Sequence, residues 1–478
     1  MQTKPSEPSA AEAPERLEQR TIEHIPASAR HGRASQLFTI WFGSNIMLLT
    51  ITNGVIATAA YGLSIWAALL ALVIGNVVGG VVMALHAAQG PQMGVPQMLQ
   101  TRAQFGSYGS LLVVTIVVVM YTAFFASNMV LGGQALAALT SIAETPAIVL
   151  VGVLGVVGAI YGYRVIHAMA GALSLLAGLA LLAAFFMLFV VVGMPSGALG
   201  SGSFSWAGFM GTISLAALWQ IAYAPYVSDY TRYMPRDTGV RAAFWATYGG
   251  CVLGSLFPMI LGALVGAAWP ALDTSSQVQN GGGALGGVIL AVFALSIAAT
   301  NAMNLYCGAL STLTIGQTLR PGWQPRAATR TIVCAVIFAV ALIIALLGKG
   351  NFLGNFENFM LLLLCVLIPW TAVNLVDYYL IRHGDYDIDS LFEADGGVYG
   401  RLNVPAVCCY VIGIGVQIPF LSNALYTGPV ATALDGVDIS WVVGLAVISP
   451  LYYVWARATR LSRDAKAATA RVGTPLAG

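Results

Sequence analysis

Charged side chains are scarce in this sequence. Of its 478 residues, 8% are charged and 58% are hydrophobic, whereas soluble domains carry about 25% charged residues. Apolar runs of about 20 residues recur from Leu37 onward, and each is long enough to cross a bilayer as a helix. The alternating pattern of a transmembrane barrel is absent. Because backbone polar groups in lipid must be paired within the protein, the sequence predicts an all-α polytopic protein that lies in a lipid bilayer.

Further absences narrow the class of protein. The first 36 residues lack the apolar core of a signal peptide, so we expect a retained, disordered cytoplasmic tail over 1–36. His86 and His167 lie near membrane ends without partners at ligand spacing, and no nucleophile–base pair stands out, which argues against an enzyme. No selectivity-filter or charged-ring pattern indicates a channel. We expect no resident metal or cofactor and no nucleic-acid partner. The six cysteines have no metal-type spacing, and all lie in apolar segments as small packed side chains: Cys251, Cys307, Cys334, Cys365, Cys408 and Cys409.

The apolar runs predict twelve transmembrane helices. They lie near 37–60, 63–88, 109–141, 146–162, 166–194, 206–230, 240–268, 284–312, 328–348, 355–381, 402–422 and 438–458. This gives a transporter domain over 37–458, with a first repeat at 37–194, a second at 206–381, accessory helices at 402–458, and a cytoplasmic tail at 459–478.

The basic residues support an even number of spans. With twelve spans, the arginines fall on one side of the membrane, and Lys349 alone falls on the other. Since cytoplasmic loops carry an excess of Lys and Arg, both termini are predicted to be cytoplasmic in a plasma-membrane protein. The residues on the basic side are those of the N-terminal tail, Arg102, Arg164, Arg232, Arg236, Arg241, Arg320, Arg326, Arg330, Arg382, Arg401 and Arg457.

Two spans carry signs of a broken helix. The first contains WFGSNIMLLTITNG, with Ser44 and Asn45 at mid-membrane depth, and the sixth contains YAPYVSDYT, with Ala222 and Tyr223 just before Pro225. Proline removes a backbone donor, and unpaired backbone in a membrane is tolerated only where it lines a protein cavity. Breaks five spans apart are typical of a transporter with two inverted five-helix repeats. The predicted fold is therefore a five-plus-five inverted repeat with two further C-terminal helices.

Polar side chains on the third and eighth spans face the same region. Asn128 follows Phe124 by one turn, while Ser296, Thr300 and Asn304 repeat every four residues, and Asn301 lies beside them. Hydrogen bonds between helices are the alternative role for each of these groups. An amide offers a donor and an acceptor side by side, which matches the edge of a purine, pyrimidine or hydantoin ring. No arginine or lysine lies at these depths, which argues against a strongly anionic substrate.

One carboxylate is placed for ion coupling. Glu357 opens the tenth span, where it is either a proton acceptor whose pKa rises on burial or an interfacial residue on the outer side. Asp229 and Asp377 lie nearer the cytoplasmic ends, where an ion pair with a loop arginine is expected.

Glycines recur at helical spacing in two places. Gly75 and Gly79 form one pair and Gly262 and Gly266 another. Such small-residue faces let helices approach closely in lipid, so we interpret both pairs as packing surfaces.

Four segments resemble the nucleobase–cation symporter-1 family, and its purine–cytosine permease branch in particular. They are GPQMGVPQMLQTRAQFGSYG (Gly90–Gly109), YAPYVSDYTRYMP (Tyr223–Pro235), TNAMNLY (Thr300–Tyr306) and FENFMLLLLCVLIPWTAVNLVDYYLIRHGDYDI (Phe356–Ile388). The resemblance implies the five-plus-five fold and import of a nucleobase, cytosine or a purine, by symport with a proton or sodium ion. It implies no other cofactor, and we expect the protein to function as a monomer.

The resemblance also implies roles for single residues. Asn128 matches the substrate amide of the third helix, with Phe124 at the aromatic position one turn earlier, and Tyr223 stands where many members have a stacking tryptophan. The remaining implied substrate positions are Ser44, Asn45, Asn301 and Asn304, and Ala222, beside Tyr223 at the break, is a further candidate substrate position.

Two departures leave alternatives open. Tyr223 supplies a smaller ring with a hydroxyl, so a related heterocycle such as allantoin, a hydantoin or a vitamin precursor is the alternative substrate. A non-transporting receptor with the same fold is a further alternative. Sodium-coupled members use two adjacent hydroxyls on the eighth helix, and here those positions are Ala299 and Thr300. One ligand is missing, which favours proton over sodium coupling, with Ser296, Thr300 and Glu357 as candidate coupling residues.

Overall fold

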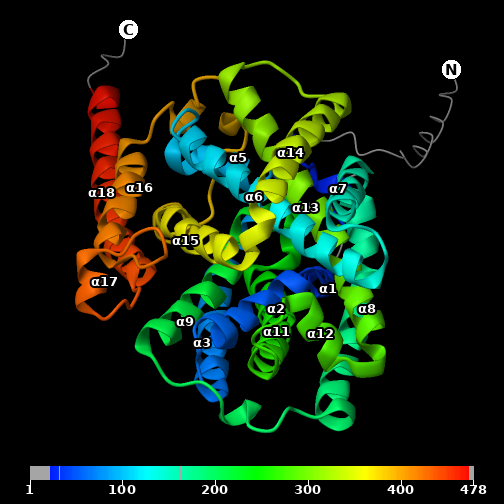
Figure 1. Cartoon of the computed structure of the whole chain (residues 1–478). Helices are drawn as coiled ribbons and strands as arrows, with labels where there is room; N and C mark the ends of the chain where they lie inside the picture. The colour runs from blue at the N-terminus through cyan, green and yellow to red at the C-terminus, as the bar shows by residue number, and fades with distance from the viewer. Residues whose placement is uncertain (1–21, 32, 162, 473–478) are drawn as a thin grey trace, which may run out of the picture.

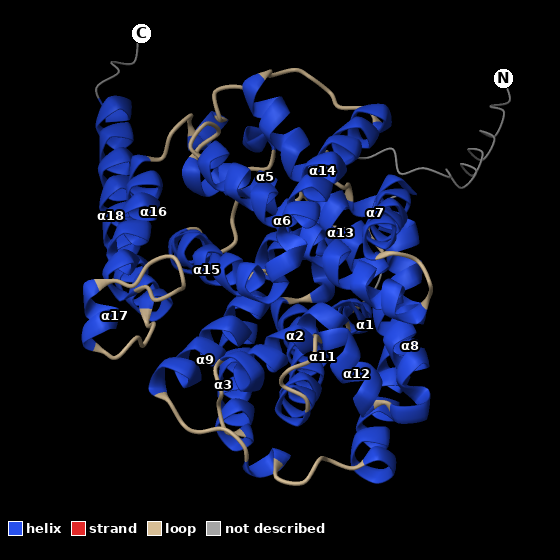
Figure 2. Ribbon diagram, in the orientation of Figure 1, coloured by secondary structure: helices blue, strands red, loops and turns tan. Residues whose placement is uncertain are grey.

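The computed structural model describes residues 22–31, 33–161 and 163–472, and Figure 1 shows the path of the chain. Within these ranges the structure is helical, with two isolated β-bridges and no strand (Figure 2). The elements at the predicted spans are α1 (Ala34–Asn45) with α2 (Leu48–Val55), α3 (Ile65–His86), α6 (Ser110–Leu139), α7 (Glu144–Tyr161), α8 (Tyr163–Phe186), α9 (Trp206–Ile221) with α10 (Val227–Thr231), α11 (Val240–Ala268), α13 (Gly286–Leu319), α14 (Ala327–Gly348), α15 (Phe352–Val376), α16 (Val404–Gln417) and α18 (Ser440–Val472).

The number of membrane helices can be compared with the prediction. Among the described residues, eight helices are long and apolar enough to cross a membrane, or nine if the bent pair α1 and α2 is one span. One of these eight, Ala327–Ile381, contains both α14 and α15, and two shorter apolar helices cover Glu144–Ile160 and Val404–Phe420. The polytopic helical architecture is confirmed, and the exact number of twelve stays a prediction.

The first predicted break is present as a bend, and the second takes the form of a change of helix type within the span Trp206–Thr231. α1 and α2 meet at an angle of 62°, because Ile46 and Met47 leave the helical conformation and Met47 is fully extended. In the sixth span, α9 ends at Ile221 and a 3-10 turn over Ala224–Tyr226 precedes α10. Pro225 cannot donate a backbone hydrogen bond to the turn before it, which explains the change of helix type.

Contacts between helices occur in equivalent pairs when each of the first five spans is matched with the span five places later in the chain. In the second span α3 packs along α9 of the sixth, and in the seventh α11 packs along α1 and α2 of the first (Figure 1). α6 and α13, from the third and eighth spans, pack along each other. The contact of α1 with α8 likewise corresponds to that of α9 with α15. Two equivalent five-helix units produce this set of neighbours, as the spacing of the breaks predicts.

The two glycine pairs lie at equivalent contacts in the two units. A Cβ at Gly75 or Gly79 of α3 would overlap the backbone of α9 at Ile213 and Ala217. A Cβ at Gly262 of α11 would overlap the carbonyl oxygen of Ile51 in α2, and one at Gly266 would meet Thr58 and Val55. Each broken helix is therefore supported by a neighbour whose backbone approaches it directly.

The ends of the chain differ from the sequence prediction. Residues 22–31 are packed rather than disordered: Ile22 and Ile25 are buried, the Ile25 amide donates to Gly94 O at 2.9 Å, and Arg30 Nη1 donates to Pro91 O at 2.7 Å. The predicted tail over 1–36 is wrong in this part, because two isoleucines find an apolar surface and α1 begins at Ala34; residues 1–21 lie outside the described ranges. At the other end α18 continues to Val472, past the predicted boundary at 458.

Short helices that the sequence analysis did not predict cover the two ends of the bundle. α4 (Gln89–Met93) and α5 (Gln97–Phe105) lie between the second and third spans, α12 (Thr274–Gly281) precedes the eighth span, and α17 (Pro429–Ala433) precedes α18. α5 is tied down by Arg102, whose guanidinium donates to Leu391 O, Thr314 O and Thr318 Oγ1. Burial lowers the pKa of Arg102 to about 10.

The carboxylates predicted near the cytoplasmic ends are buried and hydrogen-bonded. Asp377 pairs with Arg382 at 3.1 Å and accepts hydrogen bonds from the hydroxyls of Tyr386 and Tyr452. The expected ion pair with a loop arginine is confirmed for this residue. Asp229 Oδ1 accepts from the backbone amide of Gln97 at 2.9 Å, which ties α10 to α5.

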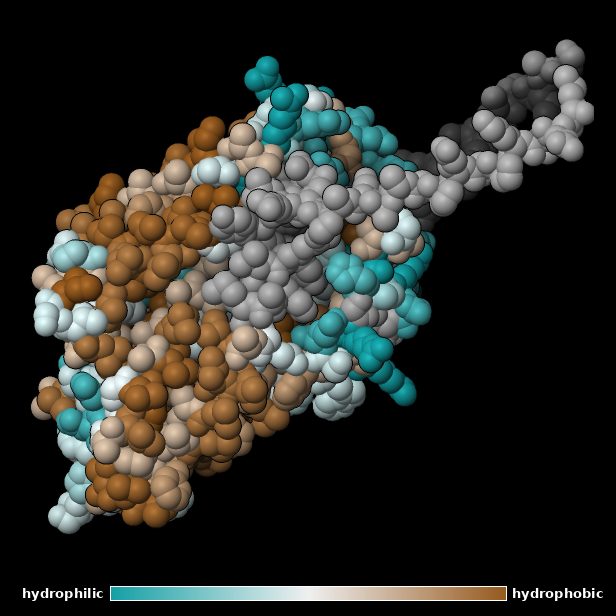
Figure 3. All heavy atoms as spheres, turned by 90° about the vertical axis from the view of Figure 1, so that its right-hand side faces the viewer, coloured by the Kyte–Doolittle hydropathy of each residue, from teal (hydrophilic) through white to brown (hydrophobic). Residues whose placement is uncertain are grey.

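The outer surface is suited to lipid. Large hydrophobic side chains are exposed at helical spacing on α8 and α14, and Figure 3 shows one broad apolar face with hydrophilic side chains gathered at its margins. The exposed residues on these two helices include Leu175, Leu179, Leu182, Phe186, Ile332, Val336, Val340 and Ile343.

We expect Gly262→Val to destabilise the protein, because the added side chain would overlap the α2 backbone and overpacking costs about 1–3 kcal/mol or more. Gly415→Val is the matched control, since Gly415 lies in α16 with nothing within 4 Å of its missing Cβ. Thermal unfolding of the purified variants in detergent measures the difference. Equal melting temperatures would show that the α2–α11 approach is not a constraint on stability.

Candidate functional site

A small cavity lies where the two breaks meet the third and eighth spans. Its volume is about 20 Å³, far below the usual range for small-molecule sites of about 300–1,000 Å³, so its walls lie close together in this conformation. Its walls come from the first break, α6, α9, the second break and α13, and consist of Met47, Phe124, Asn128, Trp219, Ala222, Tyr223, Tyr226, Thr300 and Asn304. The predicted substrate positions Phe124, Asn128, Ala222, Tyr223 and Asn304 are thus brought together.

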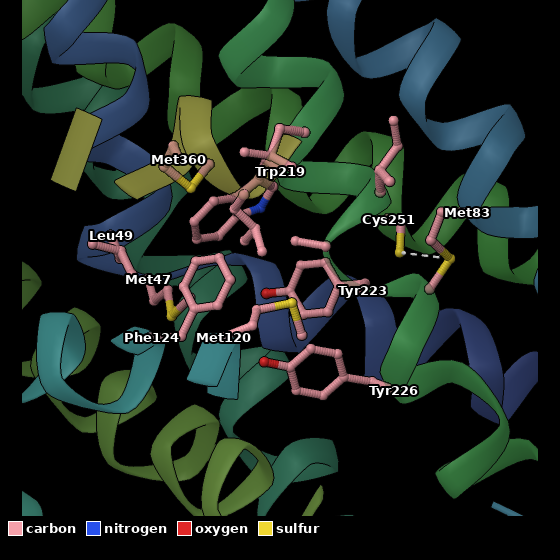
Figure 4. Packing of buried hydrophobic residues seen from close by; sticks show 14 of the residues in the cluster. Met47, Leu49, Met83, Met120, Phe124, Trp219, Tyr223, Tyr226, Cys251 and Met360 are labelled. Atoms are coloured by element: carbon pink, nitrogen blue, oxygen red, sulfur yellow. Dashed lines mark hydrogen bonds between the residues drawn. The ribbon is translucent and has the colours of Figure 1, made fainter. Parts of the chain in front are cut away.

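Aromatic rings form much of the wall. The rings of Phe124 and Trp219 lie 6.1 Å apart at 89°, and Trp219 and Tyr223 lie 6.0 Å apart at 80°. Figure 4 shows the hydroxyls of Tyr223 and Tyr226 pointing toward the side on which Phe124 lies. Edge-to-face packing holds these rings in fixed orientations, and the surface they enclose suits a flat, apolar-faced ligand.

The polar groups in the wall have unused hydrogen-bonding capacity. Asn128 is fully buried, and neither its Nδ2 nor its Oδ1 has a partner among the described residues. Asn304 Nδ2 is also without one, while Asn304 Oδ1 accepts a hydrogen bond from the Tyr226 hydroxyl at 2.6 Å. Leaving a buried polar group unpaired costs about 1–3 kcal/mol. The cavity is therefore complementary to a ligand with donors and acceptors on its edge.

Asn45 was predicted to contact substrate, but the structure gives it a different role. Its Oδ1 accepts from Trp219 Nε1 and from Ser255 Oγ, each at 2.7 Å, and its Nδ2 donates to Trp41 O at 2.6 Å. Both ends of the amide are already paired, and Asn45 does not line the cavity. It instead anchors the indole of Trp219, so it holds one wall of the site in place.

Asn301 is also absent from the cavity wall. It is fully buried, and its Cβ lies 3.0 Å from the position that a Cβ on Gly155 would take, so it faces α7. One residue along a helix is a rotation of about 100°, which separates Asn301 from Thr300 on the cavity side.

A second cavity adjoins the first break. It is lined by Gly43, Ser44, Leu173, Ser296, Ala299, Thr300 and Met303, and Thr300 also lines the first cavity. The Ser44 carbonyl accepts from Thr300 Oγ1 at 3.4 Å, and Thr300 Oγ1 and Ser296 Oγ also donate to carbonyls of their own helix. The structure thus places the predicted Ser44, Ser296 and Thr300 in the wall of one cavity, with Thr300 against the Ser44 carbonyl of the break. These oxygens suit a hard cation, but Ala299 contributes only a methyl group to the wall.

Glu357 lies apart from both cavities. Its Oε1 accepts a hydrogen bond from the Tyr61 hydroxyl at 2.8 Å. Tyr61 follows the π-helical end of the first span, Ile56–Ala60, so this contact joins the first span to the beginning of α15. Glu357 is therefore placed to link the two spans, rather than to contact a ligand.

Three wall residues were missed by the sequence analysis. Trp219 lies one turn before Tyr223, Tyr226 lies one turn after it, and Met47 lies in the first break. The i, i+4 spacing of Trp219 and Tyr223 was available as a signal, because residues four apart share a helix face. Met47 gives no such signal, since nothing distinguishes it from an ordinary packed methionine.

Comparison with known proteins gives a consistent result. Residues 24–444 match the family model described as a permease for cytosine/purines, uracil, thiamine and allantoin. A putative purine-cytosine permease, YxlA of Bacillus subtilis, is 38% identical over 92% of this chain and 96% of its own length. The purine-cytosine permease fcyB of Emericella nidulans is 24% identical over 90% and 86%. The vitamin B6 transporter TPN1 of Saccharomyces cerevisiae is 26% identical over 66% and 58%.

Solved structures show the same fold. Mhp1, a nucleobase-cation-symport-1 family transporter solved closed with bromovinylhydantoin bound, matches with a TM-score of 0.73 over 91% of this chain and 94% of its own, at 20% identity. A Na+-coupled sialic acid symporter matches with a TM-score of 0.59 over 90% and 91%, at 13% identity. With most of its length matched by the family model and by a relative of 38% identity, the chain belongs to the nucleobase–cation symporter-1 family of membrane transporters.

Proposed function

We propose that this transporter imports a nucleobase, cytosine or a purine, by symport with a cation. The observation that carries the proposal is Asn128, an unpaired amide buried between aromatic rings at the meeting point of two broken helices. An amide pairs with adjacent donor and acceptor groups on the edge of a base, while Phe124, Trp219 and Tyr223 offer apolar contact to its faces. The absence of Lys and Arg from the cavity wall suits a neutral ring.

The names of the relatives support a nucleobase as the substrate and also indicate the alternative, another heterocycle. Two relatives that match at least 90% of this chain are named as a putative purine-cytosine permease and a purine-cytosine permease. The yeast vitamin B6 transporter and the hydantoin-bound Mhp1 show that other heterocycles are handled within related chains. A related heterocycle is the second candidate here, favoured by the smaller, hydroxyl-bearing ring of Tyr223.

Transport requires that the site open to each side of the membrane in turn. In this structure the lining residues of the cavity are buried, including Asn128, Tyr226 and Asn304. The breaks supply the flexible points at which halves of the first and sixth spans can tilt around the substrate. We propose that the protein works as a monomer in the plasma membrane with both termini in the cytoplasm.

For the coupling ion we favour a proton. Ala299 contributes no oxygen from its side chain to the second cavity, whose side-chain hydroxyls come from Ser44, Ser296 and Thr300, so one of the two adjacent hydroxyls expected of a sodium site is missing. Glu357 is the candidate proton acceptor, because protonation would change its hydrogen bond with Tyr61 and thereby the link between the first and tenth spans.

Uptake by purified protein in liposomes tests the proposal. Radiolabelled cytosine, adenine, hypoxanthine, uracil and allantoin are offered under separate proton and sodium gradients. We expect accumulation of cytosine or a purine under the proton gradient alone. Accumulation only with sodium would overturn the choice of ion, and accumulation of allantoin alone would replace the substrate.

Asn128→Ala should abolish uptake while membrane insertion is unchanged, because the variant removes the unpaired donor and acceptor that face the cavity. Asn301→Ala is the matched control: its amide is equally buried and unpaired but faces α7, so the substrate KM should stay near that of the wild type. Initial uptake rates in liposomes measure both. Normal transport by Asn128→Ala would remove α6 from the site.

Glu357→Gln should weaken the dependence of uptake on the proton gradient, since an amide cannot take up and release the proton. Substrate exchange without a gradient should persist, because Glu357 is remote from the cavity wall. Tyr61→Phe keeps the carboxylate but removes the hydrogen bond through which its protonation would act, so gradient dependence should weaken in that variant as well. If Glu357→Gln responds to the gradient as the wild type does, Glu357 is not the proton acceptor and keeps only a structural role, its hydrogen bond with Tyr61.

A further inference from the structure

The sixth-span break holds a tyrosine whose hydroxyl is directed at another wall residue. Tyr226 ends the 3-10 turn after Pro225, and its hydroxyl lies 2.6 Å from Asn304 Oδ1 on α13. Its ring packs edge-on against Tyr121, with centroids 4.5 Å apart at 80°, and lies 5.6 Å from the Tyr223 ring. The Tyr121 hydroxyl donates to Pro225 O at 2.8 Å, so the ring of Tyr226 is held by a neighbour that is itself fixed to the break.

One end of the Asn304 amide faces the hydroxyl. Hydrogen bonds of the O–H···O type are typically about 2.7–2.8 Å long, whereas N–H···O bonds are about 2.9–3.0 Å. The structure places the amide oxygen against the tyrosine, at a separation of 2.6 Å that agrees with an O–H···O bond. The amide nitrogen is left on the other side, buried and without a partner among the described residues.

Asn128 and Asn304 therefore offer a ligand different hydrogen-bonding groups. Asn128 offers both a donor and an acceptor, because neither of its amide atoms is paired. At Asn304 the Tyr226 hydroxyl occupies the acceptor, and the unpaired donor remains. Without that hydroxyl, the terminal torsion of Asn304 would be free to turn by 180°, since such torsions are broad and roughly two-fold, and either atom could face a ligand.

We propose that Tyr226 is a specificity-determining residue that fixes the Asn304 amide as a donor. The site then selects a heterocycle with an acceptor at the edge that meets Asn304: an unprotonated ring nitrogen or a carbonyl oxygen. Tyr226 acts through Asn304 and is a positioning residue. The inference rests on the proposed function, because it concerns the same cavity and names the edge chemistry of its substrate.

Analogue selectivity in purified protein tests the inference. Binding of adenine, hypoxanthine and cytosine is compared with that of analogues lacking one acceptor, in which a ring nitrogen is replaced by C–H or a carbonyl oxygen by hydrogen. In the wild type, removing the acceptor that meets Asn304 should weaken binding by about 10- to 100-fold, the effect of leaving one buried donor unpaired. In Tyr226→Phe the loss of binding between a base and its analogue should fall to about 3-fold or less, because the Asn304 amide can turn.

Two variants separate positioning from general damage. Tyr121→Phe removes the α6 hydroxyl that donates to Pro225 O at the same break, and it leaves Asn304 unchanged. This variant should keep the wild-type selectivity ratio even if overall affinity falls. In an Asn304→Ala background, Tyr226→Phe should have no further effect on the ratio, as expected when one residue acts through the other.

The outcomes are distinguishable. A wild type that binds none of the three bases overturns the proposed substrate and the inference with it. A wild type that binds a base, with a selectivity ratio unchanged in Tyr226→Phe, overturns the role of Tyr226 and leaves the substrate standing. A change of ratio that persists in the Asn304→Ala background also overturns it, because Tyr226 would then act on the ligand directly.

Discussion

The close approach of two unbroken helices to two broken ones is the constraint on which this structure depends. A helix interrupted within a membrane leaves backbone groups unpaired, and lipid cannot pair them. Here α3 supports the sixth span through Gly75 and Gly79, and α11 supports the first through Gly262 and Gly266. Larger side chains at these positions would push the broken helices away from their supports. The position of the cavity between the two interrupted spans depends on this paired contact.

Within that frame, a buried amide is available to a ligand when it lines the cavity and also has no partner among the described residues; Asn301 is unpaired as well, but it faces α7. Asn45 has every polar atom engaged, with Trp219, Ser255 and the α1 backbone, so its contribution is to hold the indole. Asn128 has none engaged. Both lie at similar depth and are equally buried, and their residue type is identical. The difference arises from the neighbours that the helix rotation presents, which a single sequence does not display.

The same reasoning explains how much could be predicted from the sequence. The breaks could be predicted, because a proline or a cluster of polar residues inside an apolar run disfavours a continuous helix in lipid; the glycine pairs could be predicted from their spacing. Phe124, Asn128, Tyr223 and Asn304 were predicted because their positions match a family motif, and the structure places them in one cavity wall. Asn45 and Asn301 lie outside that wall, because residue type and depth reveal neither the partners of Asn45 nor the face of the helix on which Asn301 lies. Tyr226 and Trp219 were missed because an aromatic residue in a membrane helix usually signals packing alone.

Thr300 connects the two cavities, which bears on how an ion and a substrate could influence each other. It lines both, and its hydroxyl contacts the Ser44 carbonyl at the first break. A cation held at that carbonyl would change the hydrogen bonding of Thr300, and a ligand touching Thr300 would change the environment of the carbonyl. Such an effect on affinity is reciprocal by thermodynamic necessity. The shared residue would therefore couple the two cavities through one side chain if a cation entered the second, whereas Glu357, the proton acceptor that we propose, lies outside that route.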